Sequence, residues 1–315
     1  MISDVLLQVL ACPHCGSPMK PQSGDSLRCA GCGLIAPVRD AIPRFVDVPG
    51  DELARRTQES FGYEWTHFDD WTASGETNFE QYFSGLDART LRTARVLDAG
   101  CGMGRHARMV APHAARLIAM DFSAAIEAAA RNTRDAGNVD CVQGDITALP
   151  FADGAFDYAY SLGVLHHIAD TAGALAGIVR KVRPGGRVRV YLYWKHHGWR
   201  GAALRLVDVA RRITTRLPHP VLRALCWPLS AALMATVIWP YRLLSQFGVR
   251  AHETLPLFVY ARYPFRILYN DQFDRLSAPL EQRFDRDEVV RLLQDAGLHD
   301  VSVHASFGWI GEGTR

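Results

Sequence analysis

Five short hydrophobic runs recur through the middle of the chain, and each is followed by a polar or glycine-containing segment. The runs are five to seven residues long and occupy positions 95–99, 116–121, 139–143, 156–161 and 187–193. Their length and their content of Val, Ile, Leu, Ala and Tyr predict buried strands. Residues 105–112 fit a helix between the first two runs. Strands that alternate with helices predict a parallel sheet with helices on both faces.

The pattern near the C-terminus predicts a capped helix followed by two strands. Asp285 and Glu288 are spaced as in a capping box, the apolar positions after them have helical spacing, and Gly297 provides a stop. Residues 299–306 then predict a strand, and the last ten residues predict a short final one. We expect these elements to complete the same sheet.

Residues 224–241 carry no charged side chain, and their length barely reaches that of a membrane span. Pro228 and Pro240 are expected to interrupt this stretch and to leave about twelve residues of helix, too short to cross a bilayer. The preceding segment, 178–223, contains twelve Lys or Arg residues and one acid, Asp208. A helical lid is the preferred interpretation of the region, and contact with an anionic membrane surface or with RNA are the alternatives.

Composition and charge exclude few classes of protein. At 315 residues, with 48% hydrophobic and 22% charged residues, the chain can form one large domain or two smaller ones. A net charge of +2 does not by itself argue for nucleic-acid binding. The first residues lack the features of a signal peptide, and seven cysteines without an export signal indicate a cytoplasmic location.

Four of the seven cysteines form two closely spaced pairs, Cys12 with Cys15 and Cys29 with Cys32. In each pair two residues separate the thiols and a glycine follows, which lets a tight turn close. Thirteen residues lie between the pairs, enough for a hairpin that brings four sulfurs together. Four thiolates in a closed tetrahedron are typical of structural zinc, and a segment this short needs such a cross-link. An iron-bearing or a metal-free ribbon is the alternative.

The residues after the second cysteine pair carry a further pattern. It consists of Pro37, Val38, Asp40, Ile42, Pro43 and Phe45. In this pattern the segment resembles the end of small zinc-ribbon domains related to the activator subunit of tRNA and protein methyltransferases. Ala41 departs from that family, which usually has glycine there. The resemblance covers about residues 5–48 and implies a zinc ribbon over residues 1–48.

The first hydrophobic run leads into Asp98 and three glycines at alternate positions, Gly100, Gly102 and Gly104. A strand, a glycine-rich turn and a helix together bring backbone close to a ligand. Arg105 stands where a dinucleotide-binding motif needs its third glycine, and the Lys-Ser/Thr of a phosphate loop is missing. A carboxylate beside the first glycine disfavours a pyrophosphate and favours a cationic amino group.

Further acids follow the next strands. Asp121 ends the second run, where a carboxylate can accept hydrogen bonds from both hydroxyls of a ribose. Asp145 follows the third run, where it can accept from an adenine amino group, and capping a turn is its alternative role. One common ligand has an amino-acid end, a ribose and an adenine but no phosphate, and this ligand is S-adenosylmethionine (SAM).

Five sequence motifs follow one another along residues 94–192. In order they are VLDAGCGMGR, MDFS, GDITALPF, FDYAYSLGVLHHIAD and VRKVRPGGRV. In these motifs the chain resembles class I SAM-dependent methyltransferases and is similar to the group that includes the ubiquinone and menaquinone C-methyltransferases. The resemblance implies an α/β fold with a doubly wound, seven-stranded, Rossmann-like sheet. Its SAM-binding core covers residues 93–198, and residues 284–315 complete it.

The resemblance also implies which residues bind the cofactor. Asp98 and the three glycines of the loop would line the methionine end, and Asp121 would bind the ribose. Arg105 would pair with the cofactor carboxylate, or else be a solvated helix residue. The remaining expected contacts are Phe122, Asp145 and Ile146 around the adenine, and Ser161 and Leu162 through backbone atoms near the amino-acid part.

Methyl transfer requires a base only when the acceptor must lose a proton, as a hydroxyl does. His166 and His167 follow the fourth strand, and His196 and His197 follow the fifth, so these histidines are the candidates. Packing or capping is their alternative role, because the Leu-His-His sequence is frequent in this superfamily. The absence of an Asn/Asp-Pro-Pro-Tyr motif disfavours methylation of an amino group on adenine or glutamine.

Two segments outside the core are expected to shape the substrate site. Residues 61–83 contain eight aromatic side chains, and segment 49–92 is interpreted as a cap that folds over the cofactor and excludes water. Packing of the cap onto the sheet is the alternative role of most of these aromatics. Residues 199–283 are interpreted as a helical lid or insertion. Its candidate substrate contacts are Arg262, Tyr263, Arg266, Tyr269 and Asp271.

These expectations combine into a cytoplasmic SAM-dependent methyltransferase with a structural zinc ribbon. Its substrate is expected to be a small molecule or a lipid- or sugar-linked metabolite, with oxygen as the acceptor, and an anionic group on it would suit the basic segment. Peripheral membrane contact is left open, and nucleic acid is disfavoured as a partner. The alternatives are an RNA base methyltransferase that uses the ribbon to contact rRNA or tRNA, and a non-catalytic partner subunit with a SAM-type fold.

Overall fold

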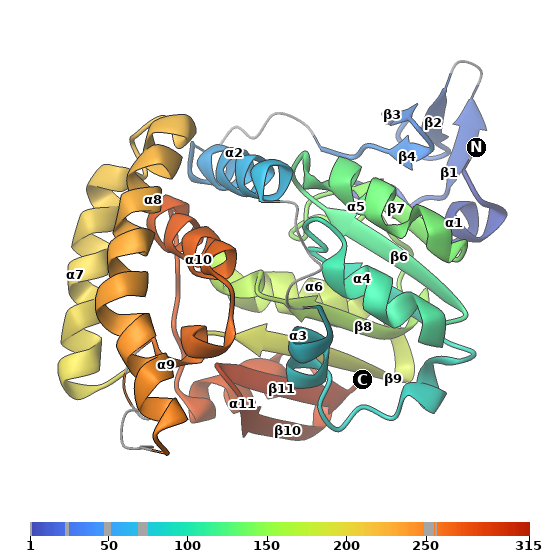
Figure 1. The fold of residues 1–315 in the computed structure, drawn as a ribbon. Coiled ribbons are helices and arrows are strands. Elements are labelled where there is room, and N and C mark those ends of the chain that lie inside the picture. Colours follow the sequence, from blue (N-terminus) through green and yellow to red (C-terminus); the bar gives the residue numbers. More distant parts are fainter. Residues whose placement is uncertain (1, 23–24, 47–51, 69–74, 249–254, 256) are drawn as a thin grey trace. The chain divides into compact units, whose positions relative to one another are not determined.

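The computed structural model describes residues 2–22, 25–46, 52–68, 75–248, 255 and 257–315. They form two compact units. The first, called the sheet unit here, comprises residues 1–69, 75–195 and 280–315. The second, called the helical unit, comprises residues 70–74 and 196–279. In Figure 1 the helical unit contains the helices labelled α7 to α10.

A seven-stranded mixed sheet with the strand order β10-β11-β9-β8-β5-β6-β7 forms the centre of the sheet unit (Figure 1). The strands are β5 (Arg95–Ala99), β6 (Arg116–Asp121), β7 (Val139–Gln143), β8 (Phe156–Leu162), β9 (Val182–Leu192), β10 (His299–Ala305) and β11 (Trp309–Thr314). Neighbouring strands from β9 to β7 pair in parallel, and β11 runs antiparallel to both β9 and β10. The expected seven-stranded, mostly parallel sheet is therefore confirmed.

Successive residues of each strand face opposite sides of the sheet, and two hydrophobic cores result. Leu97 and Ile118 lie in the core that α6 and α11 cover, whereas Val96 and Leu117 lie in the core that α4 and α5 cover. The bounds of these helices are Arg105–Val110 for α4, Ala125–Thr133 for α5, Thr171–Lys181 for α6 and Arg286–Asp295 for α11. The predicted capping box of α11 is confirmed, because the Asp285 amide donates to the Glu288 carboxylate at 2.7 Å.

The N-terminal ribbon is part of the sheet unit. It contains α1 (Asp4–Val9) and an antiparallel sheet of β1 (Met19–Gln22), β2 (Ser26–Cys29), β3 (Ile35–Arg39) and β4 (Ile42–Pro43). The Phe45 amide donates to the Gln143 carbonyl at the edge of the large sheet, over 2.8 Å. Arg44 forms an ion pair with Glu127 of α5. These contacts fasten the ribbon beside β7.

The turn between β3 and β4 has an unusual backbone conformation. Asp40 and Ala41 both have positive φ angles, of 52° and 63°. A two-residue hairpin turn of this kind favours glycine, because a Cβ atom is strained at positive φ. Ala41 is therefore held in a strained conformation by the strands on either side.

Four helices form most of the helical unit. They are α7 (Gly198–Thr214), α8 (His219–Leu233), α9 (Trp239–Gln246) and α10 (Phe265–Ser277), and a π-helical turn (Met234–Ile238) joins α8 to α9. Together α8, the π-helical turn and α9 make one continuous helix of 28 residues, His219–Gln246. Helix α10 packs against both α7 and α8.

The prediction that Pro228 and Pro240 would interrupt this helix was wrong. Pro228 lies inside α8, on its exposed side, so the carbonyl that it leaves without an amide partner can reach water. Pro240 lies in the first turn of α9, directly after the π-helical turn. A π-helical turn shifts the backbone hydrogen-bond register, which accommodates the proline ring without ending the helix.

A buried ion pair between β9 and β11 supports a prediction about stability. The side chains of Arg189 and Glu312 are each 3% exposed, and Arg189 Nε lies 2.8 Å from Glu312 Oε2. We expect Glu312→Ala to lower the free energy of unfolding by about 3–5 kcal/mol, because Arg189 would keep a buried charge without its partner. Chemical denaturation measures this change.

Asp153→Ala is the matched control for this variant. It removes a pair between Lys181 and Asp153, 2.7 Å apart, in which the acid is 63% exposed. The expected loss is below about 1 kcal/mol, because water already solvates an exposed carboxylate. Equal losses from the two variants would contradict the importance of the buried pair.

Candidate active site

The carboxyl ends of β8, β5, β6 and β7 lie side by side, because these strands are neighbours and run in parallel. The chain order reverses between β8 and β5, and α/β sheets bind ligands at such a switch point. The predicted cofactor residues end or follow these strands: Asp98, Gly100, Gly102, Gly104 and Arg105 at β5, Asp121 and Phe122 at β6, Asp145 and Ile146 at β7, and Ser161 and Leu162 at β8. The fold thus brings every one of them to one edge.

The glycine-rich loop after β5 is held tightly against its neighbours. Gly100, Gly102 and Gly104 have φ angles of 95°, 52° and 80°, a region that side chains rarely adopt. The Gly100 amide donates to the Met120 carbonyl at 2.8 Å. A Cβ atom on Gly100 would lie 2.4 Å from a methyl group of Val164. The loop therefore fits only glycine where it passes between β6 and the segment after β8.

Asp98 is a buried acid with one hydrogen-bonding side chain beside it. It is 2% exposed, and the Tyr160 hydroxyl donates to its Oδ2 at 2.9 Å. Burial raises the pKa of Asp98 to about 8; Tyr160 opposes this shift, and the negative charge of Asp121 adds to it. A cation bound next to Asp98 would favour the ionised carboxylate and lower the pKa of Asp98.

Asp121 links the ends of β5 and β6. Its Oδ2 accepts the Gly102 amide at 2.8 Å, and its Oδ1 accepts the amide and the hydroxyl of Ser123 at 2.8 and 2.7 Å. Burial raises the pKa of Asp121, while these donors lower it in part. The carboxylate is therefore fixed in place, and its remaining lone pairs can accept from a ligand hydroxyl.

The residues after β7 and at the end of β8 are also held by local bonds. Asp145 Oδ1 accepts the amide and the hydroxyl of Thr147, both at 2.8 Å, so this acid caps a turn. Both bonds use Oδ1. The Ser161 hydroxyl donates to the Ala99 carbonyl at 2.8 Å and joins β8 to β5. Ile146 and Leu162 are buried.

Helix α2 (Glu52–His67) covers this edge of the sheet. The Gln58 amide donates to the Phe122 carbonyl at 2.9 Å, and the rings of Phe61 and His167 meet edge to face with centroids 4.9 Å apart. Further along, Trp65 Nε1 lies 3.3 Å from the position that a Cβ atom on Gly102 would take. One face of α2 therefore reaches the segments after β5, β6 and β8.

Arg105 lies beneath the same helix. Its guanidinium carbon is 5.9 Å from the centroid of the Trp65 ring. The Nε atom is buried and has no hydrogen-bonding partner among the residues that the structure describes. Of the other aromatics in the cap segment, Phe79, Tyr82 and Phe83 pack into the core under α4 and α5, and Trp71 is outside the described residues.

Two of the candidate bases sit at the end of β8. His166 is fully buried and stacks on Tyr193 with ring centroids 3.9 Å apart. Burial lowers the pKa of His166 well below its usual value, and the charges of His167 and Arg283 act in the same direction. His167 Nδ1 lies 2.6 Å from the Leu280 carbonyl oxygen, which accepts from that nitrogen. Burial of His166 therefore favours its neutral form.

His196 and His197 belong to the helical unit, where they directly precede α7. His197 is exposed and its side chain does not cap that helix. Both histidines make contacts within the described part of the chain. Their proposed role as bases stays a prediction.

The four cysteine sulfurs of the ribbon meet at one point. All four lie within 4.8 Å of one another, with 3.5 Å between Cys12 and Cys32 and 3.4 Å between Cys15 and Cys29. Zinc–sulfur bonds of about 2.3 Å in a tetrahedron require sulfurs about 3.8 Å apart, close to this spacing. The cluster can therefore hold a tetrahedral metal ion.

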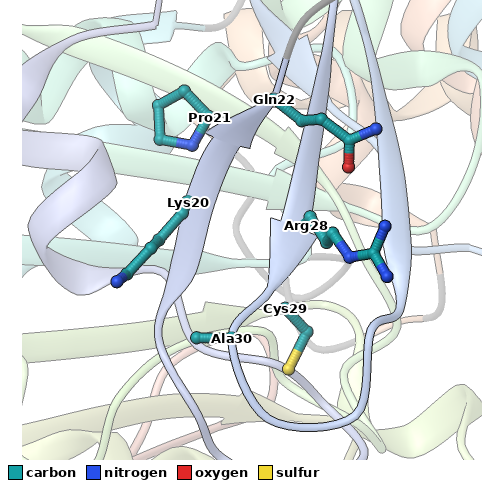
Figure 2. A pocket seen from close by; sticks show the side chains of 6 residues that line it. All are labelled: Lys20, Pro21, Gln22, Arg28, Cys29 and Ala30. Atoms are coloured by element: carbon teal, nitrogen blue, oxygen red, sulfur yellow. The ribbon is translucent and has the colours of Figure 1, made fainter.

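A hollow of about 350 Å³ lies against the ribbon hairpin, at β1 and β2 (Figure 2). Lys20 of β1 pairs with Arg28 of β2 in the strand register, and both residues make the lining of the hollow basic. Pro21, Gln22, Cys29 and Ala30 complete it. None of the candidate cofactor residues lines this hollow.

Comparison with known proteins identifies the core. Residues 97–190 match the family model of a methyltransferase domain. Malonyl-[acyl-carrier protein] O-methyltransferase of Enterobacter lignolyticus is 33% identical over 127 residues, 40% of this chain and 49% of the relative. Demethylmenaquinone methyltransferase of Renibacterium salmoninarum is 34% identical over 96 residues, 30% of this chain and 40% of the relative.

Human N-acetylserotonin methyltransferase in complex with SAM has the same fold. Its crystal structure aligns with a TM-score of 0.50 and 16% identity, over 85% of this chain and 60% of that one. The chain spans about half the length, or less, of the two curated relatives. Residues 97–190 are therefore similar to a methyltransferase domain, and the seven-stranded sheet has the fold of the aligned methyltransferase structure.

The sequence did not reveal two contacts of the site. Tyr160 bonds to Asp98 because the two residues stand at the same register of neighbouring parallel strands. Trp65 was one of eight aromatics, and only its helical spacing from Gln58 and Phe61 marks it as facing the loop. An aligned strand register and this spacing are the signals that would have found them.

The raised pKa of Asp98 makes the stability of the ligand-free protein depend on pH. Between the ordinary value of 3.8 and about 8, the folded protein keeps a proton on Asp98 that the unfolded chain releases. Stability therefore falls as pH rises through this window, by up to about 1.4 kcal/mol per pH unit. We expect Asp98→Asn to flatten the slope, measured by urea denaturation at about pH 5.5 and about pH 7.5.

Asp153→Asn, at an exposed carboxylate, should leave the slope as it is in the unmodified protein. A slope that Asp98→Asn does not change would show that this acid is not the buried, protonated group.

Proposed function

We propose that the protein transfers the methyl group of SAM to an oxygen atom of a small molecule or of a lipid- or sugar-linked metabolite. The two acids at the ends of β5 and β6 carry this proposal. Asp98 is buried with a raised pKa, and Asp121 is fixed to the glycine loop. Oxygen is the proposed acceptor because one of the relatives is named as an O-methyltransferase.

The described residues fit SAM at this edge. Asp98 offers a buried carboxylate to the amino group, and the neighbouring positive charge would draw its pKa back down. Arg105 offers its unpaired Nε to the carboxylate, and Asp121 its free lone pairs to the ribose. The other proposed contacts are Gly100, Gly102, Gly104, Phe122, Asp145, Ile146, Ser161 and Leu162. When bound, SAM supplies a methyl group on a positively charged sulfur, which needs no further activation.

His166 is the proposed general base. A neutral imidazole at the end of β8 can accept the proton that a hydroxyl loses as its oxygen attacks. Burial favours the unprotonated ring, and stacking on Tyr193 fixes the plane of the ring. His167 is held by the Leu280 carbonyl and by Phe61, so we assign it to positioning. Helix α2 above them would exclude water from the reacting atoms.

We further propose the following organisation of the chain. Residues 1–48 form a zinc ribbon, 49–92 a cap, 93–198 the SAM-binding core, 199–283 a helical insertion and 284–315 the completion of the core. Zinc is proposed for the ribbon because, among the residues that the structure describes, four sulfurs form the cluster that could hold a metal ion. Amides of Gly31 and Cys32 lie 3.3 and 3.4 Å from Cys29 Sγ, where they would stabilise a thiolate.

Metal analysis tests the ribbon. The purified protein should contain about one zinc ion per chain, and Cys29→Ser should lose it. Cys226→Ser is the control, because Cys226 is a buried cysteine of α8 and not part of the cluster. Elemental mass spectrometry measures both. Iron in place of zinc, or full zinc content in Cys29→Ser, would contradict the proposal.

Isotope transfer tests the reaction. After incubation with methyl-labelled SAM and a fractionated cell extract, label should appear in the small-molecule or lipid fraction. His166→Gln should lower kcat by about 10²–10⁴-fold, because the hydroxyl proton would have no acceptor, and should leave SAM affinity unchanged. Calorimetry with SAM measures that affinity.

Other outcomes of the same assay would overturn the proposal. Label in RNA alone would favour an RNA methyltransferase. SAM binding without transfer to any fraction would favour a non-catalytic partner subunit. A normal kcat in His166→Gln would contradict the assignment of His166 as the base, but would not contradict the proposed methyl transfer.

A further inference from the structure

Exposed hydrophobic side chains are concentrated in one part of the molecule. Fifteen large ones are exposed among the described residues, and all but Ile35 lie in the helical unit, between positions 199 and 259. Water-soluble proteins rarely expose a contiguous apolar patch of more than several hundred Å², and larger patches mark contact with a protein or a membrane.

The long helix of α8 and α9 has an apolar stripe on each of two sides. Leu222, Met234 and Ile238 are buried and belong to the side that packs within the helical unit. Four exposed residues recur along the other side: Val221 at 47%, Leu225 at 55%, Trp239 at 61% and Leu243 at 55% exposure. A helix whose outer face meets only water normally has polar residues on that face, so this second apolar stripe is not expected there.

Helix α7 has a similar stripe. Leu206, Val209 and Ile213 are spaced by three and four residues, and each is more than half exposed. The opposite side of α7 is tied to α10, because Arg211 Nε and the Thr214 hydroxyl donate to its last carbonyls. Both stripes therefore face away from α10. We call them together the apolar face of α7–α9.

The charge of the helical unit indicates what kind of partner the apolar face of α7–α9 would bind. Residues 196–279 contain eleven arginines and four acids, whereas the rest of the chain has 24 basic and 29 acidic residues. Arg205 and Arg212 are exposed on α7 next to the residues of its stripe, and Arg216 is exposed just after the helix. A second copy of the chain would bring the same positive charge to this face, which disfavours self-association.

We propose that the apolar face of α7–α9 binds the surface of an anionic lipid bilayer. Leucine and tryptophan side chains would enter the interfacial region, and the arginines would contact lipid phosphates. Trp199 and Trp239 are 64% and 61% exposed, and tryptophan is enriched at membrane–water interfaces.

The surrounding helices favour a position on the bilayer over a crossing of it. The 28-residue helix is long and apolar enough to span a membrane by length and composition. Its inner side packs on α10, which carries Asp271, Asp274 and Arg275. The Tyr269 hydroxyl also donates to the Arg223 carbonyl at 2.9 Å. A crossing would pull these charges into hydrocarbon at high cost.

Co-sedimentation of the full chain with lipid vesicles tests the proposal. The protein should bind vesicles that contain phosphatidylglycerol much more strongly than vesicles of phosphatidylcholine alone, and added salt should weaken binding. Arg212→Gln should lower the partition coefficient about fivefold, the effect of one charge near an anionic surface. The double variant Leu225→Glu/Trp239→Glu should abolish binding.

Ile35→Glu is the matched control. Ile35 is 53% exposed, and this fraction is similar to the 55% of Leu225. Because Ile35 lies in the ribbon, this variant should bind as the unmodified protein does. No binding to either vesicle would overturn the proposal. So would a change of oligomeric mass in Leu225→Glu, seen by analytical ultracentrifugation without any change in vesicle binding. Resistance to alkaline carbonate extraction would show a spanning helix instead. The assay uses no SAM, so its result is independent of the proposed reaction.

Discussion

Parallel pairing of β8, β5, β6 and β7 is the constraint on which the site depends. It places the ends of four strands in one row, so acids that are distant in sequence meet without any long loop. The bond from the Gly102 amide to Asp121 then fixes the loop of one strand to the end of the next. Because Asp98 is buried near the charge of Asp121, its ionised form is disfavoured, and a cationic ligand would reverse that preference.

Most of the core could be predicted from local sequence pattern. The runs at 95–99, 116–121 and 139–143 became strands with those same bounds, since each is a hydrophobic segment ended by a turn signal. Strand β9 instead begins at Val182, before the predicted run at 187–193, because it includes the Pro-Gly-Gly segment. Contacts such as Tyr160 with Asp98 depend on the register between strands, which a single sequence does not encode in any local pattern.

The helical unit shows where local pattern fails. Proline predicts a helix end from its missing amide and its ring, but here a π-helical turn and an exposed carbonyl offset that cost. The uncharged stretch also gave no indication of which side of the helix is exposed. The proposed contact with a membrane surface rests on knowing which sides of these helices are buried and which are exposed.

Titration calorimetry with SAM at neutral pH, in buffers of different ionisation enthalpy, tests the central claim most directly. If Asp98 exchanges its proton for the positive charge of the ligand, binding should release up to about one proton, and Asp98→Asn should release none. No binding of SAM, together with binding of NAD or ATP at the same edge, would contradict the account.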